Sequence, residues 1–373
     1  MMRLAATDRS LLAPLGVAAA GLLLCIAALF LDARAVFAGW LTAALFALGF
    51  PLGAMSILMI HGLTGGRWGE ALRPPLRAMV ATLPLALVLL LPLLVRPDFI
   101  FPWAVTDLAV LPETVRLKLA YLNMPFFLSR FAIYAAVWLV LAWLVMAGTE
   151  GTDRLNGRIS ALGLIVHGFA IAVFSTDWML SIEPEFTSTI YALLEASAEI
   201  VGAGALGLLM LAATRSIETM PGGDKRTALG EDVANMLFGF MLAWAYLAFM
   251  QWVVVWAGDL PDDIGWYIVR SRNGWQYLLL LLIVSQFVFP FAGFLNRDMK
   301  RSHRGLLLLG ALMLAGHFAD VLWRIRPPLA AAPEAWPDLA ALAAVGGLWL
   351  AGFLFAFADP QLLSPARRRT VDG

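Results

Sequence analysis

Ten apolar stretches, each long enough to cross a lipid bilayer, take up most of this 373-residue chain. A helix needs about 20 apolar residues to span the hydrocarbon core, and few charges interrupt these stretches. Only 14% of the residues are charged, which is too little polar surface for a water-soluble domain. The sequence therefore predicts an all-α integral membrane protein of about ten transmembrane helices. The predicted helices cover residues 11–31, 36–60, 77–95, 126–148, 159–180, 186–213, 234–257, 275–295, 305–325 and 339–358.

Two of the predicted helices contain proline flanked by glycine or phenylalanine. The second helix carries Gly49-Phe-Pro-Leu-Gly53, and the eighth carries Phe289-Pro-Phe291. Proline is tolerated in membrane helices where neighbours satisfy the freed carbonyl, so kinks are expected at both places. A helix broken at a binding site is the alternative, because transporters build their sites that way.

Cations are distributed unequally between the two sides of the predicted bundle. With an even number of spans both termini share one side, which holds 17 Lys and Arg residues against nine opposite. By the positive-inside rule the first side is cytoplasmic. We therefore expect a multi-pass protein of the bacterial inner membrane with both termini in the cytoplasm. The nine periplasmic cations would be Arg34, Arg96, Arg116, Lys118, Arg130, Arg270, Arg272, Arg324 and Arg326.

The predicted periplasmic side has the longer connections, 96–125 and 258–274, and collects acidic residues. An acidic face would suit a basic soluble partner such as a cytochrome c domain. Ordinary solvated loop charge explains the same pattern. The acids are Asp98, Asp107, Glu113, Glu183, Glu185, Asp259, Asp262 and Asp263.

Four acids and two histidines fall inside the predicted helices, where charge is costly and each such group is a functional candidate. Carboxyls without a cation partner there avoid the cost by taking up a proton, as proton carriers do. The alternative is that they are neutral acids hydrogen-bonded to backbone or hydroxyl groups. The candidates for a proton relay are His167, Asp177, Glu195, Glu199, His317 and Asp320.

The depths of these residues follow from the predicted connections. A tight loop of about five residues centred on Glu183 would make the fifth and sixth helices antiparallel neighbours. His167 and Glu199 lie 16 positions on either side of Glu183, so they should meet roughly 20 Å below the periplasmic end. Glu195 is one turn shallower on the face of Glu199. His317 and Asp320, at roughly 10 and 6 Å, would complete a ladder of depths.

No resident cofactor is expected on this chain. Cys25 is its single cysteine, which excludes a disulfide, a cysteine-ligated iron–sulfur cluster and a CxxCH haem attachment. Haem b would need two histidines facing each other, and only His167 and His317 offer such a pair. The sequence contains no phosphate loop, nucleophile elbow or zinc-ligand spacing. The balanced net charge makes nucleic acid an unexpected partner.

Several long motifs in the fourth to ninth helices resemble a known family. They are Tyr121–Arg130 (YLNMPFFLSR), Ser175–Tyr191 (STDWMLSIEPEFTSTIY), the stretch from Gly230 to Arg270, Gly274-Trp275, and His317–Trp323 (HFADVLW). Together they resemble the ActF-type membrane subunits of alternative complex III, a bacterial quinol:cytochrome c oxidoreductase. These subunits belong to the NrfD/PsrC-like membrane proteins.

The resemblance implies an architecture and a set of partners. It implies an N-terminal peripheral helix (1–35), four-helix bundles at 36–180 and 181–327, and a C-terminal peripheral helix with a cytoplasmic tail (328–373). It also implies an electron-transport subunit that scaffolds the complex and provides a proton pathway. The expected partners are an ActC-like homologous membrane subunit holding the quinol, a periplasmic multihaem cytochrome c, an iron–sulfur subunit and a terminal oxidase. Haem and iron–sulfur clusters would sit on those partners.

Two departures limit what the resemblance carries over. Residues 185–188 read Glu-Phe-Thr-Ser where the family has His-Trp-Phe-Ser, and Asp259 replaces an Asn. The Glu195/Glu199 pair is not part of the resemblance. Two other functions stay open: a quinone-binding anchor that uses Asp320, His317 or Asp177, and a secondary transporter, for which an inverted repeat would be expected.

Overall fold

The computed structural model describes residues 2–105, 107, 109, 111–147, 153–214, 225–333 and 335–359. The side chains of residues 2–10, 153–156, 225–228 and 262 lie outside this description. So do the predicted cytoplasmic tail at 360–373 and several of the 17 cations counted above, among them Arg3, Arg215 and Arg367.

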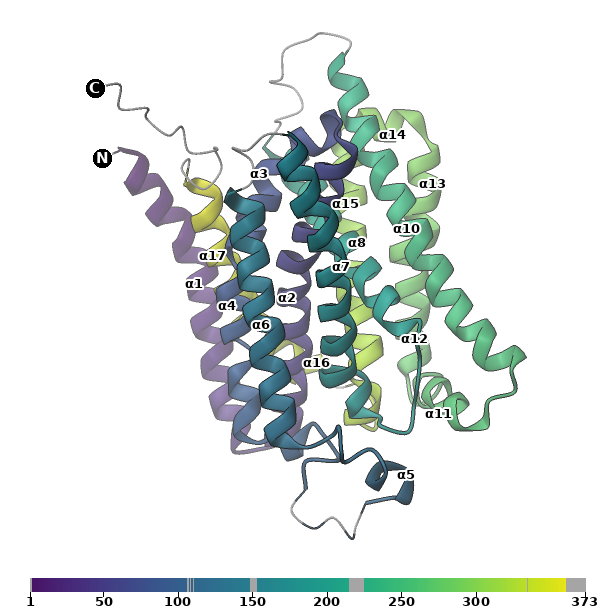
Figure 1. Cartoon of the computed structure of the whole chain (residues 1–373). Helices are drawn as coiled ribbons and strands as arrows, with labels where there is room; N and C mark the ends of the chain where they lie inside the picture. The colour runs from purple at the N-terminus through teal and green to yellow at the C-terminus, as the bar shows by residue number, and fades with distance from the viewer. Residues whose placement is uncertain are drawn as a thin grey trace.

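Ten helices long and apolar enough to cross a membrane lie in the described part of the chain, and it contains no strand (Figure 1). The predicted all-α membrane fold is confirmed. The first two are α1 (Met2–Leu29) and α2 (Ala33–Thr64), and the third is the run α3 (Arg67–Ala81), α4 (Leu83–Val88) and η1 (Leu91–Val95). Then follow α6 (Met124–Ala147), α7 (Asp153–Trp178), α8 (Tyr191–Ala213) and α10 (Lys225–Ala257). The last three are the run α12 (Trp275–Leu282), η6 (Ile283–Val288) and α13 (Phe289–Leu295), then α15 (His303–Ile325), then the run α16 (Ala335–Ala341), η8 (Leu342–Gly346) and α17 (Gly347–Ala358).

Short helical elements occupy the connections. Toward one end of the molecule lie η2 (Pro97–Phe99), α5 (Glu113–Arg116), η5 (Leu180–Ile182), α11 (Pro261–Arg270) and η7 (Pro327–Leu329). We call this the α11 end. At the other end, the α14 end, lie α14 (Arg297–Arg301), the start of α1 and the end of α17 (Figure 1). The two ends of the described chain thus lie on one side, as an even number of crossings requires.

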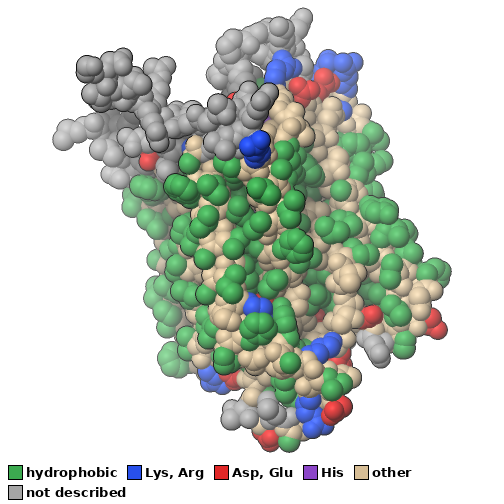
Figure 2. Space-filling view, in the orientation of Figure 1, with side chains coloured by type: hydrophobic (Ala, Val, Ile, Leu, Met, Phe, Trp, Pro, Cys, Tyr) green, Lys and Arg blue, Asp and Glu red, His purple; other side chains and the backbone are tan. Residues whose placement is uncertain are grey.

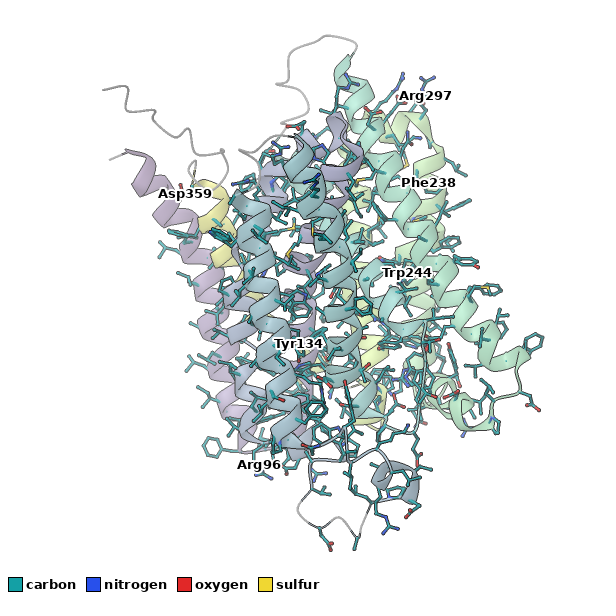
Figure 3. All side chains as sticks on the ribbon, in the orientation of Figure 1. Arg96, Tyr134, Phe238, Trp244, Arg297 and Asp359 are labelled. Carbon is teal, nitrogen blue, oxygen red and sulfur yellow. The ribbon has the colours of Figure 1, made fainter. Side chains whose placement is uncertain are left out.

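Charged side chains gather at the two ends, and hydrophobic side chains cover most of the face between them (Figure 2). Arg297 lies at the α14 end and Arg96 at the α11 end (Figure 3). This banding is what a lipid-embedded protein needs, because the hydrocarbon core solvates apolar side chains and excludes charge.

Two helices form the centre of the molecule. In the most apolar stretch of α2, 83% of the residues are buried, and in that of α8 the share is 72%. The corresponding shares are 28% for α1 and 22% for α10. Helix α2 packs against α3 and α7, whereas α8 packs against α10 and α15. Because α2 and α8 also pack against each other, residues 36–180 and 181–327 share one core. The tenth helix packs against α1 on one side and against α2 and α3 on the other.

Glycine allows the central helices to approach closely. A side-chain carbon at Gly53 of α2 would overlap the Glu199 backbone of α8, and one at Gly310 of α15 would crowd the Ala205 carbonyl. Membrane helices lack a hydrophobic force between them and rely on such small residues for van der Waals packing. The α2–α8–α15 contact is therefore fixed by sequence positions that carry no side chain.

Neither proline breaks its helix. Helix α2 continues through Pro51, so the alternative of a broken helix does not hold there. In the eighth span a wide π-helical turn, η6, precedes Phe289 and Pro290. A π turn loosens the local hydrogen-bond ladder, which accommodates the proline without ending the helix.

Candidate functional site

Four buried arginines near the α11 end organise the polar interior. Arg130, Arg270, Arg324 and Arg326 are each at most 7% exposed, and each pairs with an acid. The sequence predicted them on the periplasmic side without showing that they are buried. It also left the intramembrane carboxyls without cation partners, which is wrong for Asp177, Glu195 and Asp320.

Arg324 of α15 joins two of the candidate acids. Its Nη1 donates to the Glu195 carboxyl on α8, and its Nη2 donates to Asp320 Oδ2 at 2.8 Å, one turn earlier on α15. The ring of Tyr191 lies beside the guanidinium, 5.8 Å from its centre to Arg324 Cζ. Two carboxyls share one guanidinium here, so their pairing with Arg324 leaves one formal negative charge if both are ionised.

Arg270 of α11 links this cluster to the loop that precedes α8. Its Nη1 and Nη2 donate to the two oxygens of Glu183 at 3.2 and 2.5 Å. Nη2 also donates to the Arg324 carbonyl at 2.7 Å, and the guanidinium stacks on Trp266 at 3.6 Å. Arg270 therefore ties α11, the end of α15 and the 183 loop into one unit. Nearby, Arg326 pairs with Asp338 and joins the end of α15 to α16.

Asp177 belongs to a separate ion pair. Arg130 of α6 donates from Nε to both Asp177 oxygens at 3.0 Å and from Nη2 to Oδ1 at 2.7 Å. Its Nη1 donates to the Tyr121 carbonyl at 2.9 Å, and the guanidinium stacks on the Tyr121 ring at 3.7 Å. Burial and the Asp177 charge raise the pKa of Tyr121. This geometry is that of a clamp between α6, α7 and the 117–122 turn.

Glu199 and His317 lie together at the crossing of α2, α8 and α15. A side-chain carbon at Gly49 of α2 would lie 3.4 Å from His317 Nε2 and 3.7 Å from Glu199 Cγ. The His317 ring also fills the space above Gly202 of α8 and packs near Phe46, at 5.4 Å between ring centres. Glycines at 49 and 202 thus create the room in which the imidazole sits beside the carboxyl.

His167 does not meet Glu199, so the partner assigned from the sequence is wrong. The His167 ring lies against Trp138 of α6, with 6.2 Å between ring centres, and near the Leu52 backbone of α2. The His167 ring makes no hydrogen bond to Glu199, whose backbone meets Gly53 of α2. Helices α7 and α8 pack against each other, as predicted, but these two side chains are not paired.

The connection before α8 is longer than the tight loop predicted around Glu183. Helix α7 ends at Trp178 and α8 begins only at Tyr191, with η5 and an irregular segment between them. Glu199 is eight residues into α8, and His317 is eight residues before the end of α15 at Ile325. Glu199 is therefore roughly 12 Å from the start of α8, and His317 is roughly 12 Å from the end of α15. Both of these helix ends lie toward the α11 end, so the two residues are at matching depth.

Several polar atoms in this interior have no hydrogen-bond partner among the described residues. They are Glu199 Oε2, both ring nitrogens of His167 and His317, and both side-chain polar atoms of Gln286. Gln286 is on the π turn η6 and lies against Gly316, next to His317. Buried polar groups are nearly always satisfied, so the unpartnered atoms of Glu199, His317 and Gln286 mark a site of strain or function.

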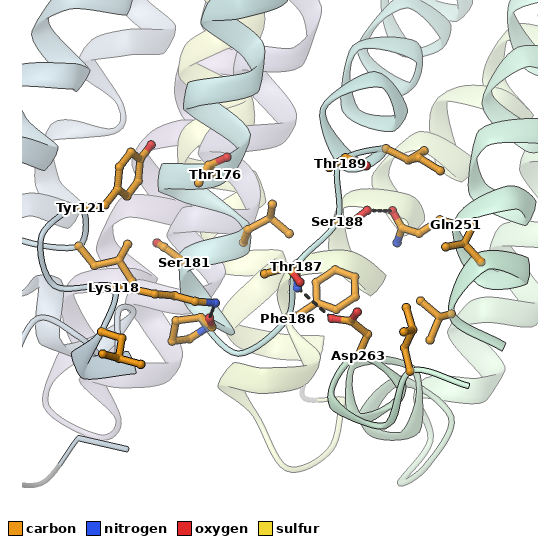
Figure 4. Close-up of a pocket in the computed structure, with 18 of the residues that line it drawn as sticks. Lys118, Tyr121, Thr176, Ser181, Phe186, Thr187, Ser188, Thr189, Gln251 and Asp263 are labelled. Carbon is orange, nitrogen blue, oxygen red and sulfur yellow. Dashed lines mark hydrogen bonds between the residues drawn. The ribbon is translucent and has the colours of Figure 1, made fainter. Parts of the chain in front are cut away.

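A cavity of about 580 Å³ opens near the α11 end, between the 117–122 turn, the 184–190 segment and the end of α10 (Figure 4). We call it the loop cavity. Lys118 Nζ donates to the Pro184 carbonyl at 2.6 Å, the Thr187 amide donates to Asp263 at 3.0 Å, and Ser188 Oγ donates to Gln251 at 3.2 Å (Figure 4).

Gln251 connects the loop cavity to the Arg324 cluster. Its side chain lines the loop cavity and also a second cavity that reaches Asp320 and Arg324. It lies within hydrogen-bond range of Tyr267, whose pKa is raised to about 12 by burial. Tyr267 therefore keeps its O–H as a donor at physiological pH.

A scan against protein-family models and a search of curated proteins found no match to this chain. What the chain does has therefore to be argued from the polar interior and from the sequence resemblance.

Proposed function

We propose that this chain is an integral membrane subunit of a respiratory quinol:cytochrome c oxidoreductase of the alternative complex III type, where it scaffolds the complex and provides a proton pathway. The observation that carries the proton pathway is the adjacency of Glu199 and His317 at a three-helix crossing. Both are buried, and Glu199 Oε2 and both His317 nitrogens have no partner among the described residues.

The chemistry of the cluster suits proton transfer. A charge at the centre of a membrane helix costs about 2.5–3.5 kcal/mol, so an unpaired carboxyl such as Glu199 is cheapest when neutral. Glu195, one turn away on α8, is paired with Arg324 and is close enough to interact electrostatically with Glu199. A relay requires neighbouring groups that differ in their affinity for the proton. The imidazole in the same pocket adds a further group that can take up and release a proton.

A route from the α11 end to this cluster is lined by polar groups. It begins at the loop cavity with Asp263 and Ser188, passes Gln251 and Tyr267, and reaches Asp320 and Arg324. Glu195 then leads to Glu199 and His317. Four of the six candidates lie on this route: Glu195, Glu199, His317 and Asp320. The other two do not, because Asp177 is held by Arg130 and the His167 ring packs against Trp138.

The positive-inside count supports assigning the α11 end to the periplasm. Four of the nine cations counted on that side are buried in ion pairs, which leaves five cations there that are not buried. Both termini would then be cytoplasmic, in a bacterial inner membrane.

The acidic loops give less support to a cytochrome partner than their number suggests. Asp98 pairs with Arg96, Glu113 pairs with Arg116, and Glu183 pairs with Arg270. The hydrogen bond from Arg96 holds the pKa of Asp98 below its usual value. The proposed partners, an ActC-like membrane subunit, a multihaem cytochrome c and an iron–sulfur subunit, therefore rest on the sequence resemblance.

Two experiments test this function. A tagged chain purified from native membranes should bring with it a multihaem cytochrome and an iron–sulfur protein; recovery of the chain alone would contradict the assignment to a complex. In vesicles containing the complex, Glu199→Gln should leave quinol oxidation nearly intact and reduce proton translocation.

His167→Gln is the matched control for the relay, because it removes a second buried imidazole away from the route. It should leave translocation unchanged. Full translocation by an assembled Glu199→Gln/His317→Gln double variant would exclude this cluster as the proton path.

A further inference from the structure

The loop cavity crosses the level at which two membrane-spanning helices end. Thr176 lines it two residues before the end of α7, and Val254 lines it three residues before the end of α10. Lys118 and Asp263 also line the cavity, and they belong to the connections beyond those helix ends. The loop cavity therefore extends from the edge of the hydrocarbon core into the layer where lipid head groups lie.

The lip of the loop cavity offers apolar surface on the membrane side. Leu117 and Val254 line the cavity and are 76% and 46% exposed. Leu193 follows the lining residue Ile190 by three positions, so it lies on the same face of α8, and it is 61% exposed. Because α8 packs against both α7 and α10, an acyl chain can pass from the cavity along Leu193 into the hydrocarbon core.

Two opposite charges line the loop cavity, and neither takes part in an ion pair among the described residues. Asp263 is only 9% exposed, and its Oδ1 accepts from the Thr187 amide. Lys118 Nζ donates to the Pro184 carbonyl, which leaves two of its three N–H donors. Figure 4 shows the two side chains approaching the 184–187 segment from opposite sides. A charge away from water is costly without a partner of opposite sign, so the cavity is suited to a ligand that brings both signs.

The signs of charge and the types of hydrogen bond select among membrane lipids. A lipid with a net negative head group would satisfy Lys118, but its phosphate would meet the Asp263 carboxylate in the same cavity. A choline head group has no N–H to donate to that carboxylate. A primary ammonium donates to Asp263 while the phosphate of the same head group accepts from Lys118, and charge-assisted hydrogen bonds of this kind are the strong ones.

We infer that the loop cavity binds the head group of a zwitterionic phospholipid with a primary ammonium, a phosphatidylethanolamine in chemical class. The ammonium donates to Asp263, the phosphate accepts from Lys118, and an acyl chain extends along Leu193 between α7 and α10. The site lies at the start of the proposed proton route, but the inference rests on the loop cavity alone and not on proton transfer.

Native mass spectrometry of the purified full chain, titrated with phospholipids that share their acyl chains, tests the inference. Phosphatidylethanolamine should bind roughly five- to twentyfold more tightly than phosphatidylglycerol or phosphatidylcholine. Asp263→Asn keeps an oxygen for the Thr187 amide and removes the charge. It should weaken phosphatidylethanolamine binding and strengthen phosphatidylglycerol binding, so that the preference is lost. Lys118→Met should weaken the binding of both lipids, and Lys118→Arg should retain it.

The matched controls are Asp259→Asn and Arg272→Met, which remove an exposed acid and an exposed cation at the same end but outside the loop cavity. Their Kd for each lipid should equal that of the unaltered chain. Soluble phosphoethanolamine carries the same two charges without acyl chains and should not displace the bound lipid. Displacement by phosphoethanolamine would identify a water-soluble ligand and overturn the inference. So would equal affinity for the three lipids, or an Asp263→Asn variant that keeps the preference for phosphatidylethanolamine.

Discussion

The imidazole of His317 on α15 occupies the space left by the missing side chain of Gly202 on α8. A carbon added at Gly202 would overlap the ring, and Gly49 of α2 lines the same space from the other side. The position of this histidine beside Glu199 is therefore specified by two glycines on other helices. Substituting these glycines perturbs the cluster without touching an ionisable group.

Gly202→Ala should destabilise the protein by about 1–3 kcal/mol, because the new methyl group overpacks a close helix contact. Gly168→Ala is the matched control, since a carbon there meets no atom within 4 Å. In a helix that control should be neutral or slightly stabilising. Thermal unfolding in detergent measures both. Equal melting temperatures for the two variants would contradict the packing of the His317 ring against Gly202.

Arg324→Met should be strongly destabilising, by about 3–5 kcal/mol, because it leaves Glu195 and Asp320 buried without a cation. The same substitution combined with Glu195→Gln and Asp320→Asn removes the whole cluster. That triple variant should recover most of the loss, since replacing a complete buried ion cluster is often close to neutral.

Folding yield and thermal unfolding compare these two variants. The stability of Arg324→Lys should lie between that of these two variants and that of the unaltered chain. An ammonium keeps the positive charge but lacks the planar fork that reaches both carboxyls. A triple variant no more stable than Arg324→Met alone would show that the cluster is not held together by charge.

The ion pair of Arg130 and Asp177 should contribute to stability and not to proton translocation. Asp177→Asn should destabilise the chain, since it leaves a guanidinium buried without its counter-charge. Proton translocation per assembled complex should be unchanged, because this pair lies off the proposed route. A variant that assembles normally but translocates fewer protons would place Asp177 on the path after all.

Hydropathy was sufficient to predict the ten spans, because a run of about 20 apolar residues has few other stable environments. It could not predict helix rotation, and that determines which ionisable residues meet. His167 and Glu199 seemed matched only because the segment from 179 to 190 was counted as a tight loop. One signal was available and unused: Arg324 lies four residues after Asp320, a spacing that brings a cation onto the same helix face.

The same omission affected the count of cations. Arg130, Arg270, Arg324 and Arg326 lie near predicted helix ends, where sequence alone does not separate a loop charge from a buried one. Three of the four pair with an acid that is distant in sequence, at Asp177, Glu183 and Glu195, so these pairs emerge only when the helices are packed. Long-range pairing across helices is a property of the fold and not of local pattern.

The orientation of the chain can be tested with its own cysteine chemistry. Cys25 is buried in α1, and a Cys25→Ser background would leave no native thiol. Arg272 is exposed in the segment after α11, and Asp298 is exposed in α14 at the opposite end.

In intact cells of a suitable bacterial host, with an outer membrane made permeable, a membrane-impermeant maleimide should label Arg272→Cys and not Asp298→Cys. Disruption of the inner membrane should make Asp298→Cys reactive to the same degree, which controls for its accessibility. The reverse pattern would put the termini in the periplasm, and the route from the loop cavity to Glu199 would then open to the cytoplasm.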